Sequence, residues 1–315
     1  MLTTESPNAI SLAELTGAGT LQRVVELHSK WRQKMPEGVR ASVSGETFSG
    51  VSFAKLELPS ANLNSSTWID SDLTDAVLSG CEMDSIDFRQ AVLNRADLAG
   101  VTADGGRWNE AWLLGAMLGE VKLTECHLKS IHADGSRWQD AQLLRCDLTS
   151  ADLSNTAFHQ AKINDTVLAQ AQLHGAQWLH ARLQLCRMVG VQAMNANFSH
   201  AVILDCDLSQ AFLVKARFNR ADLSRSRFYK ANLSECDLRD AKLAGCDLSR
   251  SSLEGERMGN TQLRAADLRG ANLRGAKELT GDQLAQAFTD NTTTLPNGAS
   301  GPFMKRSGAE RPIRA

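Results

Sequence analysis

The chain has 315 residues, of which 43% are hydrophobic and 22% are charged, and its formal net charge is −2. No apolar run reaches the ~18 residues of a membrane-spanning helix, and the start, MLTTESPNAI, lacks the basic and apolar regions of a signal peptide. These features exclude a membrane span and predict a cytoplasmic location. The seven Cys are spread singly without a C-x-x-C pair, so neither a disulfide scaffold nor a zinc finger fits.

The first element in chain order is an expected helical cap over residues 1–40. Ser11 and Glu14 have the spacing of a capping box, and Pro36 and Gly38 mark the end of the cap. One apolar face of the helix is expected to contain Leu21, Val24, Val25, His28 and Trp31.

Residues 41–276 repeat with a period of five. Of the 46 positions taken every fifth residue from Phe48 to Leu273, 43 are Leu, Phe, Trp, Met or Ile. Each exception has a β-branched residue two places earlier, so a large and a small side chain have exchanged and core volume is conserved. The three exchanged pairs are Val101 with Ala103, Ile131 with Ala133, and Val191 with Ala193.

A period of five fits neither a helix nor an ordinary strand, so it indicates a short extended piece and a corner, repeated as a solenoid. The A-[D/N]-L-x-x pattern of ADLSR (221–225) and ANLRG (271–275) resembles the pentapeptide-repeat family. The resemblance implies an all-β solenoid, a right-handed quadrilateral parallel β-helix with four pentapeptides to a coil. In each pentapeptide of that family, the central residue and the residue two places before it point inward. The repeats then predict about eleven to twelve coils, with short α-helical caps at both ends.

A four-sided coil predicts that residues twenty apart stack on successive turns. Nine of the eleven central aromatic residues fall into two such series. We therefore expect two buried aromatic columns, in which stacking adds to burial. The columns are Phe48, Trp68, Phe88 and Trp108, and then Trp138, Phe158, Trp178, Phe198 and Phe218.

Residues 277–296 are expected to form a C-terminal helical cap, because Thr280 and Gln283 have capping-box spacing before Leu284 and Phe288. Residues 297–315 are rich in Gly, Pro and charge and are predicted to be a flexible tail.

All seven Cys occupy the small inward position of the repeat, which favours inert core thiols over metal ligands. A disulfide between Cys126 and Cys146, or between Cys186 and Cys206, is the geometric alternative. Glu256 also falls in an inward position, and a local bulge or exposed edge is expected there because a buried unpaired carboxylate is costly.

The sequence predicts no enzyme, no cofactor and no metal site. It contains no Ser-His-Asp order, phosphate-binding Gly loop or H-E-x-x-H motif. His180 and His200 are expected to be axial neighbours at a corner, but two imidazoles without further ligands do not make a metal site.

The basic run 215–230 mixes Lys and Arg with Phe and Tyr, a composition that is typical of nucleic-acid-binding segments. Phe218 and Phe228 are expected inside, and only Lys230 has no acidic neighbour twenty residues away. We therefore expect a ladder of ion pairs and no direct nucleic-acid binding. The expected neighbours are Lys215 with Glu235, Arg217 with Asp237, Arg220 with Asp240, Arg225 with Asp205, and Arg227 with Asp207 and Asp247.

The surface is expected to carry outward apolar side chains, which indicate a protein partner, with a homodimer as one form of association. The function predicted is a non-enzymatic rod-like scaffold for protein–protein interaction. The candidate contact residues are Trp112, Leu114, Met194, Phe212 and Val214, and Leu185, Val202 and Leu204 are also expected to point outward.

Two alternatives follow from the resemblance. Family members that protect DNA gyrase from quinolones resemble duplex DNA, being acidic rods that dimerise end to end. Residues 41–165 carry 18 acidic and 9 basic side chains, a net −9, whereas residues 166–275 carry 10 and 15, a net +5, so only the first half fits this DNA mimicry. Some other members are secreted bacterial effectors, which the polar N-terminus permits.

Overall fold

The computed structural model describes residues 10–11 and 20–312. The chain divides into two compact units, Met1–Arg137 and Trp138–Ala315. The first unit contains β1 (Ile10–Ser11), α1 (Thr20–Arg32), β2 (Ala41–Ser42), β3 (Thr102–Asp104) and β4 (Lys122–Thr124). The second contains β5 (Gln142–Leu144), β6 (Lys162–Asn164), β7 (Arg182–Gln184), β8 (Val202–Leu204) and α2 (Gly281–Leu284).

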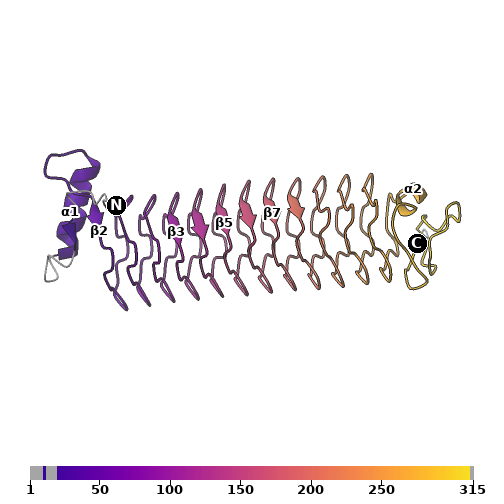
Figure 1. Ribbon diagram of the computed structural model, residues 1–315, viewed down its shortest axis with the longest axis horizontal. Helices are drawn as coiled ribbons and strands as arrows, with labels where there is room; N and C mark the ends of the chain where they lie inside the picture. The colour runs from indigo at the N-terminus through magenta and orange to yellow at the C-terminus, as the bar shows by residue number, and fades with distance from the viewer. Residues whose placement is uncertain (1–9, 12–19, 313–315) are drawn as a thin grey trace, which may run out of the picture. The chain divides into compact units, whose positions relative to one another are not determined.

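Each unit is a parallel β-solenoid in which successive turns lie side by side (Figure 1). Residues twenty apart pair in parallel, as Thr47 does with Thr67 and Gln172 with Gln192. The longer pairings are β3 with β4 in the first unit, and β5 to β8 in chain order in the second. Four pentapeptides therefore make one coil, which confirms the predicted solenoid class.

Each unit by itself holds fewer coils than the eleven to twelve predicted for the whole repeat region. At twenty residues a coil, residues 41–137 form about five and residues 138–277 about seven.

A corner follows each central residue because the last residue of the pentapeptide adopts a left-handed backbone. Asp70 has a φ of 55° and Gly80 a φ of 67°. A non-Gly residue in this region costs energy, and the hydrogen bonds to the next coil compensate for it. The N–H of Asp70, for example, donates to the carbonyl oxygen of Arg89 at 3.2 Å.

The core consists of the two inward positions of every repeat, as predicted. Large and small residues have exchanged where expected, since Val101 and Ala103 are both buried. The aromatic columns are also present. Ring centroids lie 4.3 Å apart between Phe48 and Trp68, and 4.1 Å apart between Phe158 and Trp178, whose planes differ by 5°.

The N-terminal cap is α1, which packs Val24, Leu27 and His28 against the first coil. His28 is held on both sides, because its Nδ1 accepts from the N–H of Ala41 at 3.0 Å and its Nε2 lies 2.7 Å from the carbonyl oxygen of Pro59. Of the expected capping box, Glu14 lies outside the described residues, whereas the backbone of Ser11 belongs to β1 and pairs with β2.

The C-terminal cap contains α2, whose capping box is formed as predicted. Thr280 Oγ1 accepts from the N–H of Gln283, and the Gln283 side chain accepts from the N–H of Thr280. The Gln283 amide also donates to the carbonyl oxygens of Met258 and Thr261. The prediction that Phe288 belongs to this helix is wrong: α2 ends at Leu284, and Phe288 pairs with Asp267 and is 58% exposed.

Residues 297–312 lie against this cap. The N–H of Phe303 donates to Thr289 Oγ1 at 2.9 Å, Lys305 forms a salt bridge with Asp282 at 2.8 Å, and Ala309 is buried. The flexibility predicted for this segment stays a prediction, but the described part is in contact with its unit.

The expected bulge at Glu256 is wrong. Glu256 keeps the inward position, is fully buried, and has no hydrogen-bond partner for either carboxylate oxygen in the described structure. The ladder continues past it, since the N–H of Lys277 donates to its carbonyl oxygen at 2.9 Å. The corner directly before Glu256 is formed by Gly255, which adopts its φ of 75° without a steric penalty. Burial is the main reason why the pKa of the carboxyl lies well above 4.5, and the charge of nearby Glu254 raises it further.

All seven Cys are buried and none belongs to a disulfide bond, so neither alternative disulfide is present. Burial raises the pKa of Cys81 and of Cys246 to about 12. Neither helix in the described part of the chain has the length and apolarity needed to cross a membrane.

Candidate interaction surfaces

The first unit exposes three large apolar side chains on one coil, which we call the apolar rung: Trp112, Leu114 and Met117. They are 41%, 36% and 39% exposed. All three lie in the segment 111–119, which contains no charged residue. Met117 was not among the candidates from sequence, although its place directly before the central Leu118 marks it as outward.

Neighbours on the adjacent coils hold the Trp112 ring and the Leu114 backbone in place. The Trp112 ring stacks on His132, with ring centroids 4.0 Å apart and planes 20° apart. The N–H of Leu114 donates to Asn94 Oδ1 at 3.0 Å. Val92, which pairs with Trp112 on the preceding coil, is half-buried and extends the apolar surface. The Trp112 ring, fixed in this way, loses little entropy when it binds a partner.

The other candidate contact residues belong to the second unit. The backbones of Met194 and Val214 lie on successive coils, because the N–H of Asn195 donates to the carbonyl oxygen of Val214 at 3.1 Å. Met194 is 37% exposed. Phe212 and Val214 are less exposed than Met194, because both are half-buried. Next to Met194 lies a shallow hollow of about 390 Å³. It is lined by Asn155, His174, Gly175, Met194 and Asn195. As expected, Leu185, Val202 and Leu204 also point outward.

The apolar rung and the Met194 group therefore lie in different units, and we treat them as two separate surfaces. Nothing in the structure tests their role as contact residues, which stays a prediction.

The predicted ion-pair ladder is present on the second unit. Arg225 and Asp205 form a two-point pair at 2.8 Å, and Arg227 lies 3.6 Å from Asp247. Lys215 with Glu235 at 3.7 Å and Arg220 with Asp240 at 3.8 Å complete four of the expected pairs. Asp237 differs, because its side chain binds Arg239, two residues along, at 2.5 Å while its backbone pairs with that of Arg217.

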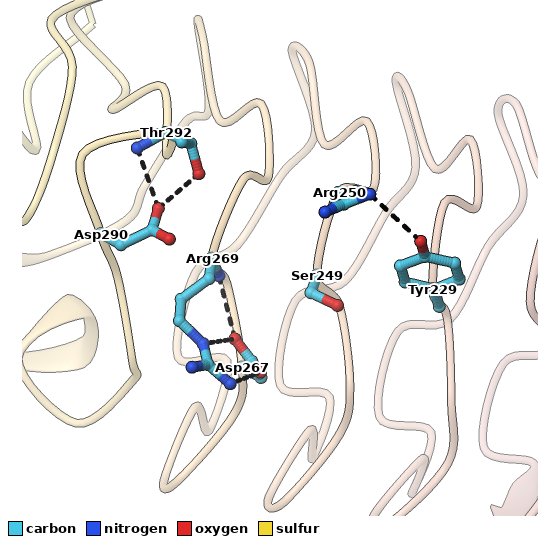
Figure 2. Close-up of a pocket in the computed structure, with 7 residues that line it drawn as sticks. All are labelled: Tyr229, Ser249, Arg250, Asp267, Arg269, Asp290 and Thr292. Atoms are coloured by element: carbon cyan, nitrogen blue, oxygen red, sulfur yellow. Dashed lines mark hydrogen bonds and ion pairs between the residues drawn. The ribbon is translucent and has the colours of Figure 1, made fainter.

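Lys230, for which the sequence predicts no acidic neighbour, lies instead over an aromatic ring. Its Nζ is 5.2 Å from the centroid of the Tyr229 ring. The Cζ of Arg250, drawn beside Tyr229 in Figure 2, is 6.0 Å from the same centroid. Arg250 Nη1 donates to the Tyr229 hydroxyl oxygen at 3.4 Å. The distances of Lys230 and Arg250 from the ring centroid are within, or at the limit of, the range of cation–π attraction.

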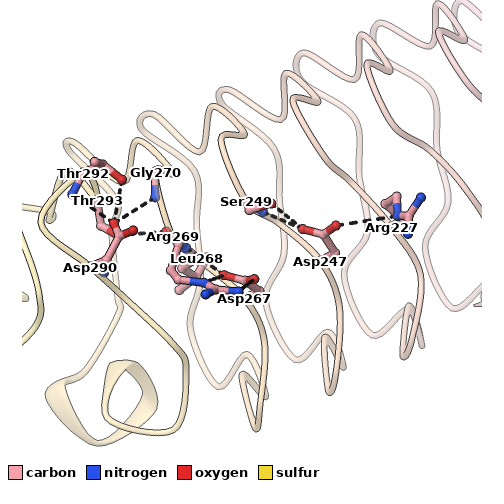
Figure 3. A network of polar contacts seen from close by, with 10 residues as sticks. All are labelled: Arg227, Asp247, Ser249, Asp267, Leu268, Arg269, Gly270, Asp290, Thr292 and Thr293. Carbon is pink, nitrogen blue, oxygen red and sulfur yellow. Dashed lines mark hydrogen bonds and ion pairs between the residues drawn. The ribbon is translucent and has the colours of Figure 1, made fainter.

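A chain of carboxylates continues from the ladder towards the C-terminal cap (Figure 3). Asp247 accepts from both the N–H and the hydroxyl of Ser249, and Asp267 forms a two-point pair with Arg269. Hydrogen bonds from Arg269 hold the pKa of Asp267 below its usual value. Asp290 has a lowered pKa for another reason, since its strongest donor is the hydroxyl of Thr292.

The described residues contain no group of three His, Cys, Asp or Glu side chains that could hold a metal ion. His180 and His200 do stack at the predicted corner, with ring centroids 5.0 Å apart.

The pattern of the pentapeptide-repeat family, in eight copies, matches residues 58–95, 71–107, 122–165, 204–240 and 241–277. No curated protein matches the chain. Among solved structures, HetL, a pentapeptide repeat protein involved in heterocyst differentiation regulation in the cyanobacterium Nostoc sp. strain PCC 7120, is 21% identical. The match covers 91% of this chain and 100% of HetL, with a TM-score of 0.30.

Two further structures are similar. A pentapeptide repeat protein of the Arabidopsis thaliana thylakoid lumen is 27% identical over 29% of this chain and 60% of its own, with a TM-score of 0.25. QnrB1, a plasmid-mediated fluoroquinolone resistance protein, is 16% identical over 78% of this chain and 94% of its own, with a TM-score of 0.22. Since the family pattern covers more than half of the residues and the coils have the expected period of twenty, the chain belongs to the pentapeptide-repeat family.

Proposed function

We propose that this protein is a non-enzymatic scaffold that binds another protein through the apolar rung. The observation that carries the proposal is the exposure of three large apolar side chains in one uncharged segment, residues 111–119. Single exposed apolar residues are common on any protein, but three within one short segment, one of them a Trp, are typical of a contact surface. Binding would remove these side chains from water without ordering a loop.

The test is affinity capture with the full chain, followed by measurement of the affinity of each captured protein. In the variant, Trp112→Ser and Leu114→Ser are combined. A matched control is Val51→Ser, which removes an exposed apolar side chain from the same unit outside the rung. We expect the control to retain the partner and the rung variant to bind it at least ~10-fold more weakly. Equal affinity for both variants would exclude the rung as the contact surface.

A second candidate, mimicry of DNA towards DNA gyrase, is favoured by the charge of the first unit alone. Several exposed carboxylates there form no salt bridge within the described chain, among them Asp70, Asp84, Glu110 and Glu120. The positive net charge of residues 166–275 opposes such mimicry over the second unit. A gyrase supercoiling assay with and without a quinolone separates the two functions. Protection of gyrase at stoichiometric protein would favour the second candidate.

A further inference from the structure

A hollow of about 390 Å³ lies on the second unit, between the coils that carry Tyr229 and Arg250 and the C-terminal segment that carries Asp290 (Figure 2). We call it the Tyr229 hollow. It differs from the rest of the ion-pair ladder, because its charged groups are divided between two sides and are not all neutralised by one another.

One side of the Tyr229 hollow is cationic: Arg250 lines it, and Lys230, which lies outside the lining, is over the Tyr229 ring. Lys230 and Arg250 occupy the same corner on successive coils, and their neighbours in that column, Gln210 and Gly270, are uncharged. In the part of the chain that the structure describes, neither cation forms a salt bridge. Both lie close to the Tyr229 ring. Two adjacent cations without a carboxylate between them attract an anion.

The hydrogen-bond donors of this side are free to bind. Arg250 Nη1 donates to the Tyr229 oxygen, so the guanidinium still has Nε and Nη2 to offer. The Tyr229 oxygen acts there as an acceptor, which leaves its O–H for another group. The hydroxyl of Ser249, in contrast, already donates to Asp247.

The other side of the hollow limits the charge of the ligand. Arg269 is neutralised by Asp267, with Nε–Oδ1 and Nη2–Oδ2 distances of 3.0 and 2.6 Å. Asp290 keeps its negative charge, because its Oδ1 accepts from the N–H and O–H of Thr292 and no cation pairs with it within the described residues. A phosphate dianion would be repelled by Asp290, whereas a single carboxylate is repelled less.

A glycine keeps the hollow open. Gly270 lies between the two sides with a φ of 70°, and a Cβ at this position would be 3.2 Å from Arg250 Cγ and 3.3 Å from Thr292 Oγ1. Asn occupies the same position of the repeat elsewhere, as Asn195 with a φ of 58° and Asn260 with a φ of 57° do. An Asn at position 270 is therefore compatible with the backbone of the corner, and its Cβ would displace the Arg250 and Thr292 side chains that line the hollow.

We propose that the Tyr229 hollow binds the carboxylate of an Asp or Glu side chain in an acidic segment of the partner protein. The Arg250 guanidinium and the Tyr229 hydroxyl donate to the carboxylate oxygens, and Lys230 adds attraction. This inference rests on the proposed scaffold function and specifies the chemistry of the partner. A planar guanidinium matches a carboxylate in geometry, so Arg250 dominates the affinity.

The test exploits the fact that Tyr229 is the single Tyr of the chain. Full-length protein labelled with meta-fluorotyrosine gives one fluorine NMR signal, which reports on this site directly. The probe is a capped Asp-Glu-Asp-Glu peptide, and its amide counterpart Asn-Gln-Asn-Gln is the control ligand. We expect a saturable shift of the signal with the acidic peptide and none with the amide peptide.

Arg250→Gln and Gly270→Asn should each weaken binding of the acidic peptide at least ~10-fold. Arg220→Gln, which removes an equal charge from an exposed Arg paired with Asp240, should leave the affinity unchanged. Circular dichroism verifies that the variants fold.

Three outcomes would overturn the proposal: no saturable shift, equal weakening by Arg220→Gln and Arg250→Gln, or binding of a phosphoserine peptide ~10-fold tighter than that of the acidic peptide. If the peptide fails while capture still depends on Trp112, the hollow is excluded and the scaffold function stands.

Discussion

The imidazole of His28 joins α1 to the solenoid: it accepts from the N–H of Ala41 through Nδ1 and donates to the carbonyl oxygen of Pro59 through Nε2. Both contacts require the neutral ring with its proton on Nε2, because a protonated Nδ1 cannot accept. Burial is the main reason why the pKa of His28 lies below 6.5. The N-terminal cap thus depends on the protonation state of one buried side chain.

We predict that acid weakens this cap. Since the folded-state pKa is lowered, the unfolded chain binds the proton more readily, and the stabilisation is present above about pH 6.5 and lost as the pH falls below it. His28→Ala should reduce the free energy of unfolding of the first unit by about 2 kcal/mol at neutral pH and flatten its pH dependence. Thermal unfolding at several pH values measures both effects. His127→Ala, at an exposed His, is the control, and an equal loss in that variant would contradict the prediction.

Glu256 should destabilise the second unit at neutral pH. Its folded-state pKa is raised, so the folded chain holds the proton that the unfolded chain releases above about pH 4.5, and stability decreases as the pH rises beyond that value. Glu256→Ala fits the slot, because the neighbours twenty residues away are Cys236 and Ala276. We expect a gain of roughly 2 kcal/mol at neutral pH.

Denaturant unfolding from about pH 4.5 to about pH 8 checks this effect. The control is Asp165→Asn, at an exposed carboxylate of the same unit that has no effect on the pKa of Glu256. If Glu256→Ala proves less stable than the parent protein at neutral pH, the side chain has a partner in solution and the prediction is wrong.

Two buried Trp residues should respond differently to replacement by Phe. Trp68 Nε1 donates to Ser66 Oγ at 2.8 Å, whereas Trp178 Nε1 has no hydrogen-bond partner in the described structure. Trp178→Phe removes an unsatisfied donor and continues a column in which both neighbours, Phe158 and Phe198, are already Phe. Trp68→Phe removes a donor that has a hydrogen-bond partner. We expect Trp68→Phe to cost about 1 kcal/mol more than Trp178→Phe, and the reverse order in thermal unfolding would refute the argument.

The seven thiols should be unreactive in the folded protein. All are buried, and the raised pKa of Cys81 and Cys246 leaves these two little thiolate at neutral pH. A hydrogen bond with Cys206 lowers the pKa of Cys186, so burial alone protects that thiol. Titration with a thiol-specific chromogenic reagent should detect no rapidly reacting thiol under native conditions and all seven in denaturant. Reaction of even one thiol within the mixing time would show that its coil opens.

The period of the sequence predicted a solenoid, and the resemblance to the pentapeptide-repeat family added the four-sided coil, from which the inward residues and most of the ion pairs were predicted. This was possible because each pentapeptide sets the direction of its own side chains, and residue i+20 always lies on the next coil. The pair of Arg225 with Asp205 and the stack of His180 on His200 therefore follow from spacing alone. For the same reason, the sequence predicted that Trp112 and Leu114, two of the three residues of the apolar rung, point outward.

The tertiary structure decided the features that do not repeat. Glu256 keeps its inward position without a bulge, because the ladder on both sides holds the backbone and Gly255 provides the corner. The Tyr229 hollow depends on the side-chain conformation of Arg250 and on residues 290–292, which follow the last repeat. Long side chains and segments outside the repeats take their positions from contacts across the fold, and a local period carries no information about those contacts.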